Sequence, residues 1–463
     1  MTLARHLTEF ISVDLFAGGG GASEGIRRAT GTCPVLAVNH SPAAIEMHKR
    51  NHPRTFHLCE SVWDVDPKEY GATERIDLLW ASPDCKHFSK AKGGKPKDSG
   101  IRGLAWVVID WARETRPSVI ALENVAELKT WGPLDEEGQP IPERAGETWR
   151  AFLQAFRDLG YTVEHRVLDA ANYGSPTHRR RLFLVARCDG KPIAWPAPTH
   201  GPGRPSRYRT YADCADWTLP TRSIFNRKKP LAEKTMARIA HGLVKYVIEA
   251  DEPYVVSIDG ETATPWIIST RNGERKGQAP RTRDVHRPFG TVTAQGSQNA
   301  VVCAWLAKHY GGVVGHGVDR PLGTITATDH HALCEAEIAR VSGNNARHIM
   351  PFLTSYYGTG IGQRVTAPLR TITTRDRFGL INVLVEIDGE RWVITDIRMR
   401  MLQPRELARC QGFPDSYVLT GNKREQVARI GNSVCPQAAE AVVRAQFPGL
   451  PTVGQIELFG GDR

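Results

Sequence analysis

Short apolar runs alternate with amphipathic stretches over the first part of the chain. Residues 10–16, 76–80 and 119–125 consist mostly of apolar side chains and predict buried strands. Residues 43–49 and 148–157 repeat their apolar positions at the spacing of one helix face. Strands that alternate with helices are typical of a parallel sheet covered by helices. We therefore predict an α/β domain with a doubly wound, Rossmann-like sheet.

Several of the predicted strands adjoin residues that can do chemistry. Cys85 follows one apolar run, Glu123 lies at the end of another, and Arg179 and Arg181 precede a third. Open α/β sheets carry their active sites at the carboxyl ends of strands. We therefore expect the thiol, the carboxylate and the guanidinium groups to converge on one site.

A glycine-rich turn follows the first predicted strand. Residues 17–21 are one alanine and four glycines, and a predicted helix begins near Ala22. Such a turn lets the backbone approach a nucleoside cofactor closely, and the amino terminus of the helix favours its negative groups. The same turn is also a common strand-to-helix connection that binds nothing, so the turn by itself leaves both interpretations open.

Six sequence blocks, taken in their order along the chain, resemble the DNA (cytosine-5) methyltransferases. The blocks are residues 14–20, 85–89, 123–125, 172–181, 405–414 and 430–434. The resemblance covers about residues 10–190 and 398–445. The stretch between these two parts is where that family keeps its variable target-recognition region.

The resemblance implies covalent catalysis on cytosine. Cys85 would add to carbon 6 of the ring, because carbon 5 alone is too poor a nucleophile to take a methyl group from S-adenosylmethionine. Glu123 would protonate or hydrogen-bond ring nitrogen 3, and Asn124 would help to orient Glu123. Arg181 and Arg179 would hold the oxygen at position 2 by charge-assisted hydrogen bonds.

The resemblance also assigns residues to the cofactor. They are Asp14, Phe16, Gly18 and Gly20 around the glycine-rich turn, Asn39 after the second predicted strand, and Asn432 and Ser433 near the carboxyl end. The contact with the adenine falls at Glu60, Ser61 or Asp64, and the sequence does not choose between these three. We expect no metal, because no cysteine and histidine spacing is typical of a zinc site.

The chain departs from the family pattern around the nucleophile and the cofactor. Asp84 and Lys86 flank Cys85, where the family has proline and glutamine. Asn39 stands where family members present an acidic residue to the cofactor ribose. Three alternatives remain: the same chemistry on a structured RNA, a catalytically inactive DNA-binding relative, and a dinucleotide-dependent oxidoreductase. The last is disfavoured because the turn lacks a clear GxGxxG followed by an acidic residue.

Prolines and glycines mark a linker near residues 195–205, and the sequence repeats itself beyond that point. Three copies of a proline followed by an alternating Thr-(Ile/Val)-Thr triplet occur at residues 287–293, 320–326 and 367–373. The alternation predicts half-buried strands. We predict a catalytic domain in residues 1–195, a mainly β target-recognition domain with three repeats in 196–390, and a segment in 391–463 that returns to the catalytic domain.

Composition indicates which kind of partner the chain binds and in which cellular compartment it works. A net charge of +10 over 463 residues favours a polyanionic partner. Basic residues in or beside the loops of the repeat region either contact DNA or form a solvated face; they are Arg271, Arg275, Lys276, Arg281, Arg283, Arg287, Arg375 and Arg377. Nine cysteines without CxxC pairs indicate a reducing compartment. We expect a monomer that binds double-stranded DNA, without a membrane span, in the cytoplasm of a bacterial or phage-infected cell.

The sequence generates a test of the nucleophile. Cys85→Ser should abolish methyl transfer and leave the fold and DNA binding largely intact, because a serine hydroxyl is a far weaker nucleophile than a thiolate. A duplex that carries 5-fluorocytosine should form a covalent adduct with the unaltered chain only, as measured by denaturing electrophoresis. Full turnover by the serine variant would overturn the assignment.

Overall fold

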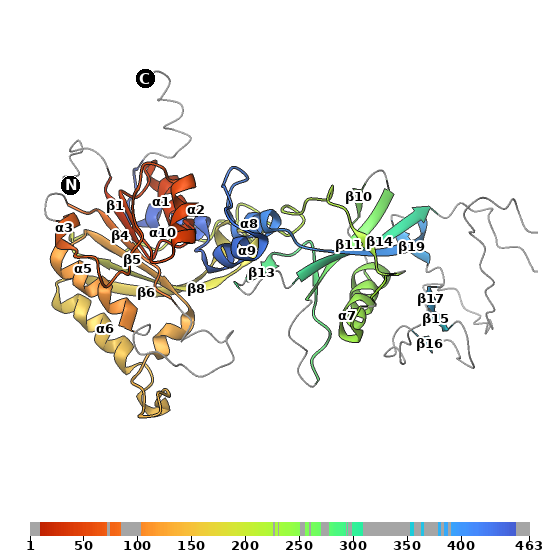
Figure 1. Cartoon of the computed structure of the whole chain (residues 1–463), viewed down its shortest axis with the longest axis horizontal. Helices are drawn as coiled ribbons and strands as arrows, with labels where there is room; N and C mark the ends of the chain where they lie inside the picture. Colours follow the sequence, from red (N-terminus) through yellow and green to blue (C-terminus); the bar gives the residue numbers. More distant parts are fainter. Residues whose placement is uncertain are drawn as a thin grey trace, which may run out of the picture. The chain divides into compact units, whose positions relative to one another are not determined.

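A computed structural model shows two compact units (Figure 1). The structure describes residues 10–71, 75–84, 103–225, 227–229, 231–250, 255–258, 261–269, 277–292, 294, 299–308, 352–355, 363–364, 378–380, 384–387 and 390–450. The first unit comprises residues 1–215, 286–297 and 403–463, and the second comprises 216–285 and 298–402. The first unit thus extends beyond the predicted boundary at residue 195 and contains part of the first repeat.

The first unit is built on a seven-stranded sheet in the order β3-β2-β1-β4-β5-β8-β6. The strands are β1 Ser12–Leu15, β2 Leu36–Val38, β3 Phe56–Leu58, β4 Leu78–Ala81, β5 Val119–Asn124, β6 Thr162–Asp169 and β8 Arg180–Arg187. Neighbours from β3 to β5 pair in parallel, whereas β8 is antiparallel to both β5 and β6. The predicted α/β class is confirmed, but the sheet is mixed. The connection from β6 to β8 is too short for the crossover that parallel pairing requires.

Helices cover both faces of this sheet (Figure 1). The helices of the first unit are α1 Gly21–Thr30, α2 Pro42–Asn51, α3 Lys68–Gly71, α5 Val107–Thr115, α6 Glu147–Asp158, α8 Pro404–Gln411, α9 Lys423–Asn432 and α10 Pro436–Gln446. Leu79 of β4 packs in the core beneath α5 and α6, and its neighbour Trp80 packs beneath α1 and α10. Successive side chains of a strand point to opposite faces, so one strand serves two cores.

Short elements complete the first unit. They are the 3-10 helices η2 Leu104–Trp106, η3 Ala126–Thr130, η4 Pro142–Arg144 and η5 Ala170–Tyr173, and the strands β7 Thr177–His178 and β13 Phe289–Gly290. β13 begins directly after Pro288 in the first predicted repeat, and it pairs in parallel with β7. Residues 286–297 therefore belong with the first unit through backbone pairing beside the arginine block.

The second unit is mainly β, in agreement with the expected class. Its main sheet is antiparallel, in the order β10-β11-β14-β19-β18, with β12 beside β11 and β9 beside β19; a smaller sheet has the order β16-β15-β17. The strands are β9 Arg222–Ser223, β10 Val256–Ile258, β11 Glu261–Ser269, β12 Thr282–Asp284, β14 Asn299–Lys308, β15 Phe352–Ser355, β16 Gln363–Arg364, β17 Phe378–Leu380, β18 Leu384–Ile387 and β19 Glu390–Met401.

One helix covers the main sheet of the second unit. α7, Glu233–Leu243, continues as a π-helical turn, Val244–Ile248, and packs Ile239 and Leu243 against Trp266 of β11. The second and third repeats, at residues 320–326 and 367–373, lie outside the described residues, as do Arg375 and Arg377. The assignment of this unit to target recognition therefore stays a prediction. Among the described residues, no helix has both the length and the apolar character needed to cross a membrane.

The close packing of α1 on α10 generates a stability prediction. In an open helix, Gly25→Ala would stabilise the protein by up to about 1 kcal/mol. Here a Cβ atom at residue 25 would lie 2.5 Å from Ala439 Cβ and 2.6 Å from Pro436 O. We expect Gly25→Ala to destabilise the first unit by about 1–3 kcal/mol instead. Thermal unfolding of the full chain measures this change, and a raised melting midpoint would contradict it.

Candidate active site

The direction of the chain connections reverses between β1 and β4. β2 and β3 lie beyond β1, whereas β5 lies beyond β4, so the strands that follow extend the sheet in opposite directions. Leu15 and Ala81 are paired at the carboxyl ends of β1 and β4. The glycine-rich turn after β1 and the segment after β4 therefore start side by side. Such a reversal point is where open α/β sheets bind their ligands.

The segment after β4 is held by the end of β5. Asn124 Nδ2 donates a hydrogen bond of 3.0 Å to the carbonyl of Pro83, and Asn124 Oδ1 accepts one of 2.8 Å from the Val125 amide. These contacts show that Asn124 connects the ends of the two strands, and its expected role in orienting Glu123 stays a prediction. Cys85 itself lies outside the described residues, two positions beyond Pro83.

Glu123 and Arg181 form an ion pair at the carboxyl end of β5. Arg181 Nε lies 3.2 Å from Glu123 Oε1, and only 10% of the Glu123 side chain and 18% of the Arg181 side chain are exposed. Antiparallel pairing aligns Asn124 with Leu182, which brings the start of β8 to this end of β5. The structure thus brings together two of the residues that the sequence predicted to be catalytic.

Arg179 lies in a different environment. It is 6% exposed, and its Nη1 donates a hydrogen bond of 3.3 Å to the Val292 carbonyl. The guanidinium therefore holds the segment that contains β13. Its predicted contact with a substrate oxygen stays a prediction.

A second thiol lies near the arginines, and sequence reasoning missed it. Cys435 is 2% exposed at the start of α10, and burial raises its pKa to about 11, although the charges of Arg179 and Arg181 oppose the rise. A thiol with this pKa is protonated at neutral pH and is a poor nucleophile. Cys435 directly follows the block at residues 430–434, but only the three-dimensional structure shows that it lies near Arg179 and Arg181.

The glycine-rich turn has no room for a side chain at Gly19 or Gly20. Phe16, Gly18 and Gly20 have positive φ angles of 62°, 51° and 85°. A Cβ atom at Gly19 would lie 2.9 Å from Ser433 Oγ, and one at Gly20 would overlap the Tyr417 hydroxyl. The turn is thus a close-fitting backbone surface at the start of α1, which suits the approach of a nucleoside cofactor. Ser433 packs against the turn at Gly19, and its predicted contact with the cofactor stays a prediction.

The other predicted cofactor residues differ in exposure. Asp14 is fully buried, and its carboxylate accepts a hydrogen bond of 2.6 Å from Ser23 Oγ. Asn39, after β2, is half-buried, and its side chain accepts a hydrogen bond from the Ser41 amide. Asn432 is exposed at the end of α9.

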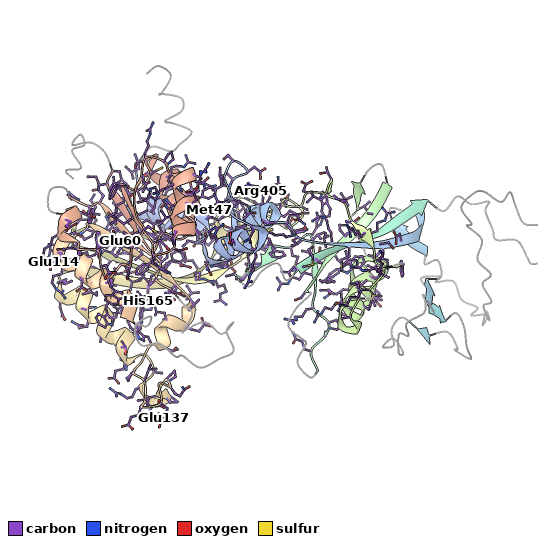
Figure 2. The ribbon with its side chains drawn as sticks, in the orientation of Figure 1. Met47, Glu60, Glu114, Glu137, His165 and Arg405 are labelled. Atoms are coloured by element: carbon purple, nitrogen blue, oxygen red, sulfur yellow. The ribbon has the colours of Figure 1, made fainter. Side chains whose placement is uncertain are left out.

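The three candidates for the adenine contact follow β3. Glu60, which is labelled in Figure 2, and Asp64 are exposed, whereas Ser61 is half-buried. Exposure does not choose between them, so the alternatives stay open. Among the described residues, no group of three or more histidine, cysteine, aspartate or glutamate side chains could hold a metal ion.

Comparison with known proteins identifies the family. The family model for C-5 cytosine-specific DNA methylases matches residues 10–447. The chain belongs to this family.

The chain is similar in sequence to bacterial type II methyltransferases. Type II methyltransferase M.AgeI of Thalassovita gelatinovora is 32% identical over 201 residues, 42% of this chain and 43% of the relative. Type II methyltransferase M.XorII of Xanthomonas oryzae is 34% identical over 201 residues, 42% of this chain and 44% of the relative. The chain therefore matches less than half the length of each.

A solved structure extends the likeness to the fold. DNMT2 of Spodoptera frugiperda, in a mutant form, superposes with a TM-score of 0.50 at 14% identity, and the match covers 95% of this chain and 100% of that chain. At this identity the likeness concerns the fold alone.

A buried chain of polar side chains runs behind the glycine-rich turn, and sequence reasoning missed it. Ser23 Oγ donates to Asp14, so His48 Nε2, 2.8 Å from Ser23 Oγ, donates to that hydroxyl. His48 Nδ1 then accepts from His57 Nε2 at 2.8 Å. A single histidine in a predicted helix does not by itself indicate that it joins a buried hydrogen-bonded chain. The only sequence signal was the repetition of histidine at positions 48, 52 and 57.

Burial shifts the pKa values in this region in opposite directions. It raises the pKa of Asp14 to about 7, which the hydrogen bond from Ser23 only partly offsets. It lowers the pKa of His52 to about 4 and the pKa of His48 well below its ordinary value. At neutral pH both imidazoles are therefore neutral, as the directed hydrogen bonds require.

These shifts generate a pH prediction. The unfolded chain binds protons at His52 and His48 below pH 6.5, where the folded chain excludes them, so acid favours unfolding. Asp14 acts in the opposite sense, because its contribution to stability is present at low pH and is lost as the pH rises toward 7. Since two strongly shifted histidines oppose one carboxyl, we expect the free energy of unfolding to fall as the pH falls from 6.5 to about 4.

A matched pair of variants tests the contribution of His52. His52→Gln should weaken the pH dependence by up to about 3 kcal/mol across this window, as measured by denaturant unfolding at several pH values. His40→Gln, which changes an exposed histidine of the same unit, should leave the dependence unchanged. An equal pH dependence in His52→Gln and the unaltered chain would contradict the prediction.

Proposed function

We propose that this chain transfers a methyl group from S-adenosylmethionine to carbon 5 of cytosine in double-stranded DNA. Family membership supports the reaction class. The structural observation that carries the proposal is the largely buried pair of Glu123 and Arg181, at the sheet edge where Asn124 holds the segment leading to Cys85. A carboxyl group and a guanidinium group side by side can hydrogen-bond a nitrogen and a neighbouring oxygen of one pyrimidine ring.

The glycine-rich turn would hold the cofactor. The positive φ angles at Phe16, Gly18 and Gly20, and the absence of Cβ atoms at the glycines of the turn, let its backbone approach a ligand closely, which supports this assignment. Asn39 and Asn432 would contact polar groups of the cofactor, and buried Asp14 would support the turn from the core. S-adenosylmethionine supplies an electrophilic methyl group when bound.

The remaining steps belong to the residues of the chain. The Cys85 thiolate adds to carbon 6, and the electron pair displaced from the ring double bond makes carbon 5 nucleophilic. Glu123 hydrogen-bonds or protonates ring nitrogen 3, and Arg181 stabilises the charge on the oxygen at position 2. Arg179 would contribute to the same charge stabilisation. After methylation, a base removes the proton from carbon 5 and the thiolate leaves.

The substrate base must leave the DNA helix for this reaction. A stacked cytosine shields both faces of carbon 6, so an attacking thiolate requires a flipped-out base. The second unit, with exposed Arg283 on β12, would recognise the target sequence. We further propose that the chain acts as a monomer in the cytoplasm of a bacterial or phage-infected cell, as the modification enzyme of a restriction-modification pair.

Two alternatives share this site geometry. A structured RNA could supply the flipped cytosine, and an inactive relative could bind DNA without methylating it. Bisulfite sequencing of both DNA and RNA from cells that express the chain tests both alternatives, because it reports activity and sequence context for each nucleic acid. Methylation of a structured RNA but not of duplex DNA would replace the proposed substrate.

The charged pair generates a kinetic prediction. Glu123→Gln and Arg181→Ala should each slow the chemical step by about two or more orders of magnitude, because each removes a group that stabilises charge on the ring. Single-turnover methylation of duplex DNA with radiolabelled S-adenosylmethionine measures the step. Cofactor affinity should change little in either variant.

An exposed pair of the same kind provides the control. Arg144 and Glu147 are an ion pair in the same unit, with 50% and 46% of their side chains exposed. Arg144→Ala and Glu147→Gln should leave methylation within about twofold of the unaltered chain, because exposed pairs contribute little. If Glu123→Gln and Arg181→Ala impaired cofactor binding alone, their proposed place beside the cytosine would be wrong.

A further inference from the structure

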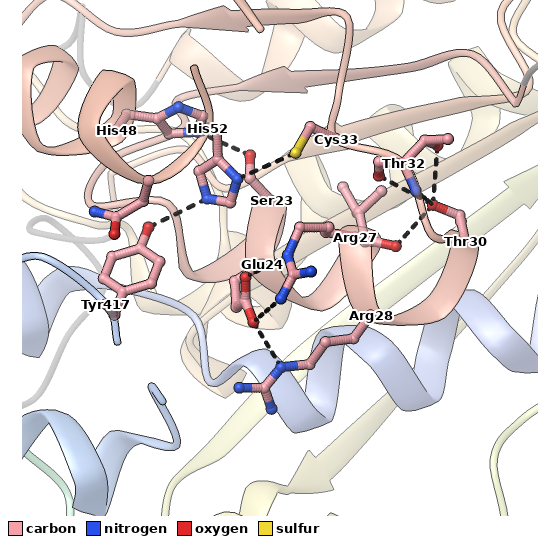
Figure 3. A network of polar contacts seen from close by, with 12 residues as sticks. Ser23, Glu24, Arg27, Arg28, Thr30, Thr32, Cys33, His48, His52 and Tyr417 are labelled. Atoms are coloured by element: carbon pink, nitrogen blue, oxygen red, sulfur yellow. Dashed lines mark hydrogen bonds and ion pairs between the residues drawn. The ribbon is translucent and has the colours of Figure 1, made fainter. Parts of the chain in front are cut away.

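A second polar chain reaches the glycine-rich turn from the carboxyl-terminal part of the sequence. Tyr417, which is 3% exposed, donates a hydrogen bond of 2.8 Å to the carbonyl of Gly19. His52 Nε2 lies 3.3 Å from the Tyr417 hydroxyl, and His52 Nδ1 lies 3.5 Å from Cys33 Sγ. Figure 3 shows His52 between Cys33 and Tyr417. Residues from three separate segments thus join at one backbone carbonyl.

The direction of these hydrogen bonds follows from the donors available. The Tyr417 hydroxyl has one proton and gives it to Gly19, so it accepts from His52 Nε2. His52 Nδ1 is then the acceptor and faces the Cys33 thiol. Neutral His52 fits this arrangement, because only a neutral imidazole combines one donor with one acceptor.

This chain fixes a single peptide plane of the turn. The Gly19 carbonyl accepts from Tyr417, and the amide of the next residue, Gly20, donates 2.9 Å to the Ala17 carbonyl. Both polar groups of the peptide that joins Gly19 to Gly20 are therefore bound. Gly20 is the N-cap of α1, so the same plane sets where the helix begins.

The tyrosine is itself held rigidly. The Tyr417 carbonyl accepts a hydrogen bond of 2.8 Å from Arg405 Nη1, and its ring lies 4.6 Å from that of Phe413. The next residue, Val418, exchanges two backbone hydrogen bonds with the side chain of Asn51. The hydroxyl is thus delivered to the turn from a fixed position.

Gly20 shows that the fit is close. A Cβ atom at this residue would overlap the Tyr417 hydroxyl and lie 3.2 Å from His52 Nε2. Glycine at residue 20 therefore serves two needs: a left-handed backbone with φ of 85° and room for the tyrosine hydroxyl. The turn and the polar chain are complementary surfaces.

We propose that Tyr417, oriented by His52, is a positioning residue that holds the glycine-rich turn in the conformation that binds S-adenosylmethionine. This inference rests on the proposed function. Without the hydroxyl, the Gly19 carbonyl loses its buried partner, and only the hydrogen bond from the Gly20 amide to the Ala17 carbonyl still holds the peptide plane in the binding conformation. The affinity for the cofactor then falls, because part of the binding free energy is used to order the turn when the cofactor binds.

Tyr417→Phe tests the inference, because it removes the hydroxyl and keeps the ring. The dissociation constant for S-adenosylmethionine, measured by calorimetry on the full chain, should rise about five- to tenfold. In steady-state methylation of duplex DNA, KM for S-adenosylmethionine should rise by a similar factor, while kcat stays within about twofold. A change in kcat with unchanged affinity would overturn the positioning role.

A second buried tyrosine provides a matched control. Tyr161, also 3% exposed, donates a hydrogen bond of 2.9 Å to the Pro117 carbonyl and has no part in the turn. Tyr161→Phe should lower the melting midpoint about as much as Tyr417→Phe but should leave cofactor affinity unchanged. If both variants lost affinity for S-adenosylmethionine equally, the loss would reflect lower overall stability, and the inference would be overturned.

His52 provides the rescue. His52→Gln retains an amide donor that can reach the Tyr417 hydroxyl, so its affinity should stay within about twofold of the unaltered chain. His52→Leu removes the donor and should resemble Tyr417→Phe. Equal affinity in the glutamine and leucine variants would exclude His52 as the residue that orients Tyr417.

The two proposals fail in different ways. If the unaltered chain bound no S-adenosylmethionine, the proposed function would fail. If the unaltered chain and Tyr417→Phe both bound it normally, this inference alone would fail.

Discussion

The parallel pairing of β1 with β4 is the constraint on which the catalytic unit depends. Because Leu15 pairs with Ala81, the turn after β1 and the segment after β4 begin at the same edge of the sheet. The buried side chains of β4 enforce this pairing by serving the cores on both faces. A shift of register by one residue would exchange those faces and separate the two segments.

The second level of organisation is the close fit around the glycine-rich turn. Glycine residues let Tyr417, Ser433 and the turn approach one another more closely than any side chain would allow. Close approach also buries polar atoms, and each of these atoms must find a partner or lower stability. The chains through His48 and His52 supply partners for the buried hydroxyls of Ser23 and Tyr417 while both rings stay neutral. They couple the conformation of the turn to helix α2 and to the carboxyl-terminal segment.

The antiparallel strand β8 contributes what a purely parallel sheet could not. Parallel neighbours present their carboxyl ends together, whereas an antiparallel neighbour presents its beginning at the same edge. Arg181, near the start of β8, therefore meets Glu123, near the end of β5. Burial of the pair excludes water and strengthens its electrostatic interactions. The same burial keeps Cys435 protonated nearby, which separates its chemistry from that of a catalytic thiol.

The sequence determined the α/β class and the blocks that mark the family, because these depend on local patterns of apolar and polar residues. It also supplied Glu123 and Arg181 as candidate residues, but their meeting required the antiparallel direction of β8. Tertiary structure decided the rest. Contacts between distant segments set the direction of β8 and the hydrogen-bond partners of Asn124 and Arg179. They also place residues 286–297 in the first unit. The buried histidines were equally hidden, since a histidine on a helix acquires its role only from the side chains that face it. Local sequence specifies which groups are present, and long-range packing specifies which of them meet.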